Sequence, residues 1–240
     1  MSIHVTVWNE NRTKPSTEKM YEVYPEGIHG MLKEIFERAG FEVRVALLDE
    51  AQSGLGKDVL EWTDVLVYWS HIAQEELPDC VAESIVNRVN QGMGFIPLHS
   101  AHRCKPFVRL MGTTCSLRWR ESFDREILWG IQPSHPILEG VGEYITLQPE
   151  EMYGEYFDIP KPDETVLLGW FSGGEVFRSG VCYRRGSGKI FYFQPGHETY
   201  PTYKNEEIQK ILANAVRWAA PASMKESVHE CRKTEPVQHD

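Results

Sequence analysis

Two histidines stand where strands of an open α/β sheet are expected to end. His99 follows the apolar run "GFIPL", and His197 follows the run "KIFYFQPG". Side chains that leave such a sheet at the carboxyl ends of its parallel strands face one crevice, where ligands bind. We therefore predict that the two imidazoles share a pocket. There a histidine can transfer protons or hold a metal ion.

Carboxylates that could work with these histidines are concentrated in the segment "PEEMYGEYFDIP". Glu151 and Glu155 are four residues apart, which on a helical turn places both on one side. Either could act as a general base beside the histidines. A carboxylate with two imidazoles also suits zinc, so His99, Glu155 and His197 form a candidate site for a divalent metal such as zinc.

Aromatic and polar residues next to these positions indicate a carbohydrate pocket. Trp69 and His71 end another expected strand in "WSH", and Tyr153 lies among the carboxylates. An aromatic ring accepts the C–H face of a sugar, while carboxylates accept its hydroxyls. Arg178 could bind a sugar hydroxyl or carboxylate, although a surface salt bridge is the commoner role for such an arginine.

Other reactive residues in the same stretches favour structural roles. Ser100 stands where a helix N-cap would stand. "PLHSA" lacks both glycines of the G-x-S-x-G elbow of serine hydrolases, so we expect Ser100 to be a cap and not a nucleophile. His102 is three residues after His99, and we expect it to face water in the first helical turn. Three cysteines among apolar neighbours are expected to be inert buried thiols: Cys104, Cys115 and Cys182.

The elements that must position these residues follow from hydrophobic periodicity. Four strand-like runs alternate with helical ones over the first half of the chain and predict a parallel sheet with right-handed crossovers. They are "IHVTVWNE", "FEVRVALLD", "DVLVYWSH" and "GFIPLHS". Residues 113–168 are rich in aromatics, proline and glycine, and we expect loops there. A hairpin joined by "GSG" and a helix beginning after Asn205 complete the domain.

Composition and charge exclude several classes of protein. The formal net charge is 25 minus 35, or −10, spread along the chain, which argues against a nucleic-acid partner. No apolar run approaches the roughly 20 residues of a membrane span, and the N-terminus lacks a secretory signal. Five cysteines without CxxC spacing fit reduced thiols. We therefore expect a cytoplasmic protein with no membrane or nucleic-acid partner.

Four motifs in the order "GFIPLHSA", "SHPILEGV", "EEMY" and "GKIFYFQPGH" resemble the ThuA-like family, named for trehalose utilisation. The resemblance implies a flavodoxin-like, class I glutamine amidotransferase-like three-layer α/β sandwich with a mostly parallel central sheet. It also implies that His99, Glu151, Tyr153 and His197 are the family's recurrent positions. In amidotransferases the elbow carries a cysteine, so His99 at that position makes glutamine hydrolysis unlikely to occur here.

These observations lead to one main hypothesis with two alternatives. The chain is expected to be a carbohydrate enzyme acting on a disaccharide or keto-sugar, as a hydrolase, lyase or isomerase, with catalytic His99, Glu151 and His197. The alternatives are a non-catalytic sugar-binding or regulatory module, and a serine or cysteine hydrolase. We expect one domain over residues 1–220, a polar tail over 221–240 and contacts between identical subunits in a homo-oligomer.

Overall fold

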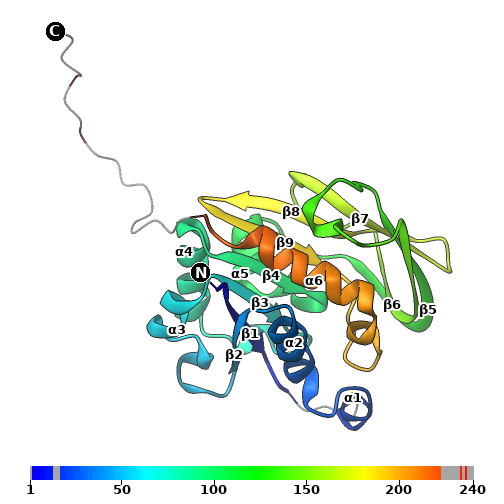
Figure 1. Cartoon of the computed structure of the whole chain (residues 1–240), viewed down its shortest axis with the longest axis horizontal. Helices are drawn as coiled ribbons and strands as arrows, with labels where there is room; N and C mark the ends of the chain where they lie inside the picture. The colour runs from blue at the N-terminus through cyan, green and yellow to red at the C-terminus, as the bar shows by residue number, and fades with distance from the viewer. Residues whose placement is uncertain (1, 13–16, 223–232, 234–235, 237–240) are drawn as a thin grey trace.

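The computed structural model describes residues 2–12, 17–222, 233 and 236. Its described strands form one nine-stranded mixed sheet in the order β2-β1-β3-β4-β9-β8-β7-β5-β6 (Figure 1). The first five strands in this order are parallel: β2 (Glu42–Leu47), β1 (His4–Asn9), β3 (Val65–Trp69), β4 (Gly94–Leu98) and β9 (Gly188–Phe193). We call them the parallel half.

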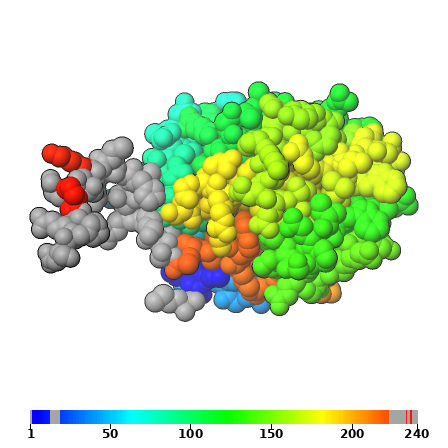
Figure 2. Space-filling model, turned by 90° about the horizontal axis from the view of Figure 1, so that it is seen from above, coloured from blue at the N-terminus to red at the C-terminus, as the bar shows by residue number. Residues whose placement is uncertain are grey.

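Four longer strands extend this sheet with antiparallel pairings only. They are β8 (Val176–Arg185), β7 (Glu164–Phe171), β5 (Arg118–Gly130) and β6 (Tyr144–Gly154). We call them the antiparallel extension; its green to yellow residues make up much of the face seen in Figure 2. Because its strands are the longer ones, the prediction of a mostly parallel sheet is wrong.

Helices cover both faces of the parallel half. On one face lie α1 (Thr17–Val23), α2 (Gly27–Arg38) and α6 (Glu206–Ala219), and on the other lie α3 (Lys57–Trp62), α4 (Asp79–Gln91) and α5 (Lys105–Met111). Alternating side chains of one strand enter different cores: Val67 packs toward α2 and α6, whereas Leu66 and Tyr68 pack toward α4 and α5. No helix of the described residues is long and apolar enough to cross a bilayer.

Most of the local elements agree with the sequence patterns. The four predicted strands correspond to β1 to β4, the "GSG" hairpin to β8 and β9, and Asn205 caps α6 by accepting hydrogen bonds from the backbone N–H groups of Glu207 and Ile208. The loops expected over residues 113–168 are instead largely β5 and β6. Register shifts between Arg120 and Asp124 interrupt the alternation that would have revealed these strands. The predicted tail over 221–240 lies mostly outside the described residues.

Candidate active site

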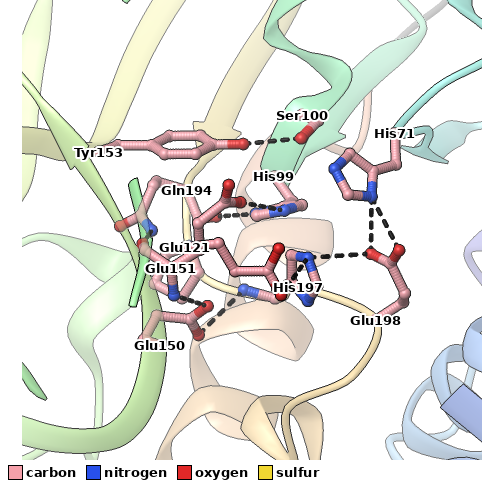
Figure 3. Close-up of polar contacts among 12 residues, drawn as sticks. His71, His99, Ser100, Glu121, Glu150, Glu151, Tyr153, Gln194, His197 and Glu198 are labelled. Atoms are coloured by element: carbon pink, nitrogen blue, oxygen red, sulfur yellow. Dashed lines mark hydrogen bonds and ion pairs between the residues drawn. The ribbon is translucent and has the colours of Figure 1, made fainter. Parts of the chain in front are cut away.

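Chemically active side chains gather where the parallel strands end. Trp69 at the end of β3 is in register with Asn9 of β1 and with Leu98 of β4, and Leu98 is in register with Phe193 of β9. The chain therefore leaves four adjacent strands at one edge of the sheet. Figure 3 shows His71, His99 and His197 pointing toward one another there. Their ring centroids are 5.1 to 5.5 Å apart.

His99 occupies a constrained elbow between β4 and the 3-10 helix η3 (His99–Arg103). Its φ of 53° lies in the left-handed region, which costs a non-glycine residue about 1 to 3 kcal/mol and is typical of functional sites. Its ring is stacked between Trp69, at 6.5 Å, and Tyr153, at 5.3 Å. His99 Nδ1–H donates to the carbonyl of Gln194 at 3.1 Å, so Nε2 faces the site.

His99 Nε2 lies 3.1 Å from Oε2 of Glu151, which extends from β6. Both side chains are buried. Burial alone would lower the pKa of His99, but the hydrogen bond and charge of Glu151 outweigh it, and the pKa is raised. Burial would raise the pKa of Glu151, yet the same hydrogen bond lowers it. The two residues therefore form an ion pair that links the two halves of the sheet.

His71 and Glu198 form a second pair beside the first. His71 Nδ1 lies 2.7 Å from Oε2 of Glu198 and 2.9 Å from Oε1. Burial alone would raise the pKa of Glu198, but the hydrogen bond from His71 lowers it to about 2. His197 lies between the pairs, with Nε2 3.6 Å from Glu198 Oε2. Burial lowers the pKa of His197 to about 4, so this imidazole is neutral at pH 7.

The donor atoms of this cluster fit a metal ion. One donor atom each from His71, His99, His197 and Glu198 can be chosen so that all lie within 4.8 Å of one another. His99 Nε2 and Glu198 Oε2 are buried and have ion-pair contacts as their only polar partners among the described residues. Three imidazoles and one carboxylate are ligands that zinc accepts, and the Nδ1–H of His99 is held by a carbonyl, as in many metal-bound histidines.

Two buried carboxylates outside the cluster hold its backbone in place. Glu10, just after β1, accepts hydrogen bonds from the N–H groups of Ile72 and Ala73, at 2.8 and 2.9 Å, and so fixes the loop that carries His71. Glu150 accepts from the Gly196 N–H, the Thr202 hydroxyl and the N–H of its neighbour Glu151. Glu150 thereby ties β6 to the loop that carries His197 (Figure 3).

A cavity of about 390 Å³ adjoins the cluster. Glu151, Tyr153 and His71 form part of its wall. Glu151 thus contacts both His99 and the space in which a ligand of monosaccharide to disaccharide size would fit.

Comparison with known proteins identifies the family. The family model described as trehalose utilisation matches residues 4–219. The chain belongs to the ThuA family. No curated protein shows significant sequence similarity to it.

Solved structures related to this ThuA family member share its fold. A putative ThuA-like protein from Parabacteroides merdae has a TM-score of 0.69 at 16% identity, covering 95% of this chain and 93% of that chain. A cytoplasmic protein from Salmonella typhimurium has a TM-score of 0.59 at 15% identity, covering 90% and 99%. A glutamine amidotransferase from Thermotoga maritima has a TM-score of 0.52 at 13% identity, covering 90% and 97%. The amidotransferase-like α/β fold implied by the motifs is therefore confirmed.

The structure brings together most of the site residues predicted for this ThuA protein. His99, Glu151 and His197 meet, and His71 and Tyr153 line the same region. Trp69, predicted to contact substrate, is only 4% exposed. Its indole N–H donates to the Gly196 carbonyl at 3.1 Å, and its ring lies behind His99. Trp69 therefore positions the imidazole instead of facing the cavity.

Glu155 and Arg178 lie away from the histidines and bind each other. The Arg178 guanidinium donates to Glu155 Oε1 at 2.8 Å and Oε2 at 2.9 Å, and to the Phe157 carbonyl. Glu155 is therefore not a candidate ligand, and the carboxylate that lies among the three histidines is that of Glu198. The helical turn predicted for Glu151 and Glu155 is also wrong, because Glu151 lies in strand β6. Arg178 forms a salt bridge, which was the predicted alternative to binding a sugar hydroxyl or carboxylate.

His102 does not face water as predicted, whereas the three cysteines are buried as predicted. His102 is buried, lines the cavity and donates from Nδ1 to the Cys115 carbonyl at 2.6 Å. Cys104, Cys115 and Cys182 are buried, and burial raises the pKa of each thiol, to about 11 for Cys115. Such thiols are poor nucleophiles.

Glu10, Glu150 and Glu198 are not among the site residues that the sequence predicted. Glu198 directly follows the predicted His197, and Glu150 directly precedes the predicted Glu151. Their position next to predicted site residues was the feature of the sequence that could have indicated them. That position does not predict which of two neighbouring side chains points into the site.

Proposed function

We propose that the chain is a carbohydrate-processing enzyme that holds a divalent metal such as zinc at His71, His99, His197 and Glu198. The observation that supports this best is the buried convergence of these four donors beside a cavity. The ThuA family membership supports the carbohydrate role. The bound metal would polarise a sugar carbonyl or activate a water molecule.

Glu151 is the residue that we assign to proton transfer. Its carboxylate lines the cavity 3.1 Å from His99 Nε2. A metal bound to Nε2 would displace the hydrogen there and leave the Glu151 carboxylate free to accept a proton from substrate or water. The backbone of Glu151 is fixed by Glu150, which limits the movement of its side chain. Tyr153 stays protonated because burial raises the pKa of its phenol, so its hydroxyl can orient a substrate oxygen.

Metal content separates this proposal from its alternatives. The purified protein would be stripped with a chelator, reloaded with zinc, dialysed and measured by elemental analysis. We expect about one equivalent in the wild type and in Glu155→Gln, and loss of it in His197→Ala and Glu198→Gln. His4→Ala, at the opposite end of the sheet, is the histidine control. A wild type that retains no zinc, or a Glu198→Gln variant that retains it fully, contradicts the metal site.

Turnover tests the enzymatic part. Trehalose, maltose, sucrose and keto-sugars would be incubated with the zinc-loaded protein and followed by NMR. We expect conversion of at least one sugar, and a reduction of at least about hundredfold in Glu151→Gln with zinc content unchanged. Sugars that bind tightly but are recovered intact would instead identify a non-catalytic sugar-binding module.

The surroundings in which the chain works are also part of the proposal. Two solved neighbours from Salmonella typhimurium are described as cytoplasmic proteins, and we propose the same location here.

The homo-oligomer expected from the sequence would be tested by light scattering coupled to size-exclusion chromatography. A measured mass equal to that of the monomer would contradict it.

A further inference from the structure

The cavity beside Glu151 has walls that the metal cluster does not use. It extends over η3 and the start of β5, and its lining includes Ser100, His102, Arg103 and Trp119. Ser100 and His102 are buried, whereas Trp119 is 66% exposed. The cavity therefore combines a fixed polar wall with an accessible aromatic side chain.

His102 offers a hydrogen-bond acceptor with a defined identity. Its Nδ1 lies 2.6 Å from the Cys115 carbonyl, which can only accept, so Nδ1 carries the hydrogen. Burial lowers the pKa of His102 to about 4, and the ring is therefore neutral. In a neutral ring with Nδ1 protonated, Nε2 has a lone pair and can accept a hydrogen bond from a hydroxyl.

The opposite polar group is a pair of hydroxyls. Ser100 Oγ and Tyr153 Oη are 2.7 Å apart, so one of the two donates to the other. The pair keeps one hydroxyl hydrogen and free lone pairs for a ligand, and can both donate and accept. This dual character suits a sugar hydroxyl better than a group that only accepts.

Trp119 adds an apolar surface to these polar groups. It lies in β5 at the rim of the cavity and has the second largest exposure among the large hydrophobic residues of the described chain, after Tyr156. An exposed indole at a pocket rim offers a flat face against which the C–H groups of a sugar ring can pack. The cavity lining carries two carboxylates, Glu75 and Glu151, against one guanidinium, Arg103, and this excess of negative charge makes an anionic ligand unfavourable.

We infer that this cavity is a subsite for an uncharged sugar, in which Trp119 packs on the C–H face of the ring and His102 Nε2 accepts a hydrogen bond from one sugar hydroxyl. The inference rests on the carbohydrate role in the proposed function and goes further, because it assigns the two specificity-determining residues. Neither residue belongs to the metal cluster or transfers the proton.

Calorimetric titration of the zinc-loaded protein with trehalose, maltose, sucrose, glucose and glucuronate tests the subsite. For the neutral sugar that binds best, we expect Kd to rise about tenfold in Trp119→Ala and less in Trp119→Phe. Trp170→Ala removes another exposed tryptophan of the extension, outside the cavity, and should leave Kd unchanged. Zinc content, measured in parallel, should be the same in all variants.

The role of His102 is tested with His102→Asn, whose amide can still donate to the Cys115 carbonyl but lacks the Nε2 acceptor. Monodeoxy derivatives of the best sugar would be titrated into both proteins. We expect one derivative to bind the wild type about tenfold more weakly than the parent sugar, and this difference to disappear in the variant.

Each result bears on one hypothesis. Sugar conversion by the wild type with unchanged Kd in Trp119→Ala and His102→Asn overturns the subsite and leaves the proposed function standing. Sugar binding that depends on Trp119 and His102 in a protein without zinc or turnover supports the subsite and contradicts the enzyme. Preferred binding of glucuronate, or no binding of any sugar, overturns the subsite.

Discussion

Glu126 is a fully buried carboxyl group whose hydrogen bonds require it to be protonated. Gln194 Nε2 donates to the Glu151 carbonyl at 3.2 Å, which leaves Gln194 Oε1 to accept from Ser179 at 3.0 Å. Ser179 has one hydroxyl hydrogen and gives it to Gln194. The 3.0 Å contact between Ser179 Oγ and Glu126 Oε1 is therefore donated by the acid. Burial, aided by the charge of Glu150, raises the pKa of Glu126 well above 4.5.

This proton makes the stability of the protein depend on pH. In the unfolded chain Glu126 loses its proton near the ordinary pKa of 4.5, whereas the folded protein keeps it. Above that pH the folded state binds more protons than the unfolded state. The stabilising contribution of the Glu126 proton is therefore fully present below pH 4.5 and falls as pH rises toward the folded pKa. One proton corresponds to about 1.4 kcal/mol per pH unit. For as long as the folded protein keeps this proton, the loss from pH 5.5 to 7.0 amounts to about 2 kcal/mol.

Glu126→Gln removes the titration and keeps a donor for Ser179. The free energy of unfolding of the variant, minus that of the wild type, should therefore increase by about 2 kcal/mol from pH 5.5 to 7.0. The assay is urea denaturation at four pH values with a chelator present, because a bound metal would add its own pH dependence. Glu143→Gln, which changes an exposed carboxyl just before β6, is the control. If the free energies of unfolding of Glu126→Gln and the wild type change equally with pH, Glu126 is not protonated in the folded protein.

Three further predictions concern the frame of the site. Asn205→Ala removes the N-cap of α6 and should lower the free energy of unfolding by about 1 kcal/mol in urea titrations, whereas Asn205→Asp should retain most of it. Gly188→Ala places a Cβ against the Val89 carbonyl oxygen, so β9 or α4 must move, and the melting temperature should fall by several degrees in calorimetry. An unchanged melting temperature would contradict this prediction. Glu10→Gln loosens the His71 loop and should weaken zinc affinity about tenfold in competition titrations; an unchanged affinity would contradict the supporting role of Glu10.

Local sequence patterns were sufficient to predict the elements of the parallel half and the two strand-end histidines. Apolar periodicity and glycine at the ends of elements depend only on neighbouring residues, which is why β1 to β4, the hairpin and α6 were predictable. The placement of His99 and His197 at one sheet edge followed from the parallel connections. Glu151 was predicted as a candidate general base from the carboxylate-rich segment, and the family resemblance named the same residue.

Which residues complete the site depends on strand pairings between distant parts of the chain. The pairing of β5 with β6 joins positions as far apart as Arg118 and Gly154, and no local pattern records that pairing. Just after β6, the Glu155 N–H donates to the carbonyl of Val176 at the start of β8. This contact brings the Glu155 carboxylate within reach of Arg178. A partly desolvated carboxylate forms an ion pair with a cation that lies close to it. Glu155 therefore binds Arg178, and Glu198 is the carboxylate that lies beside His71 and His197.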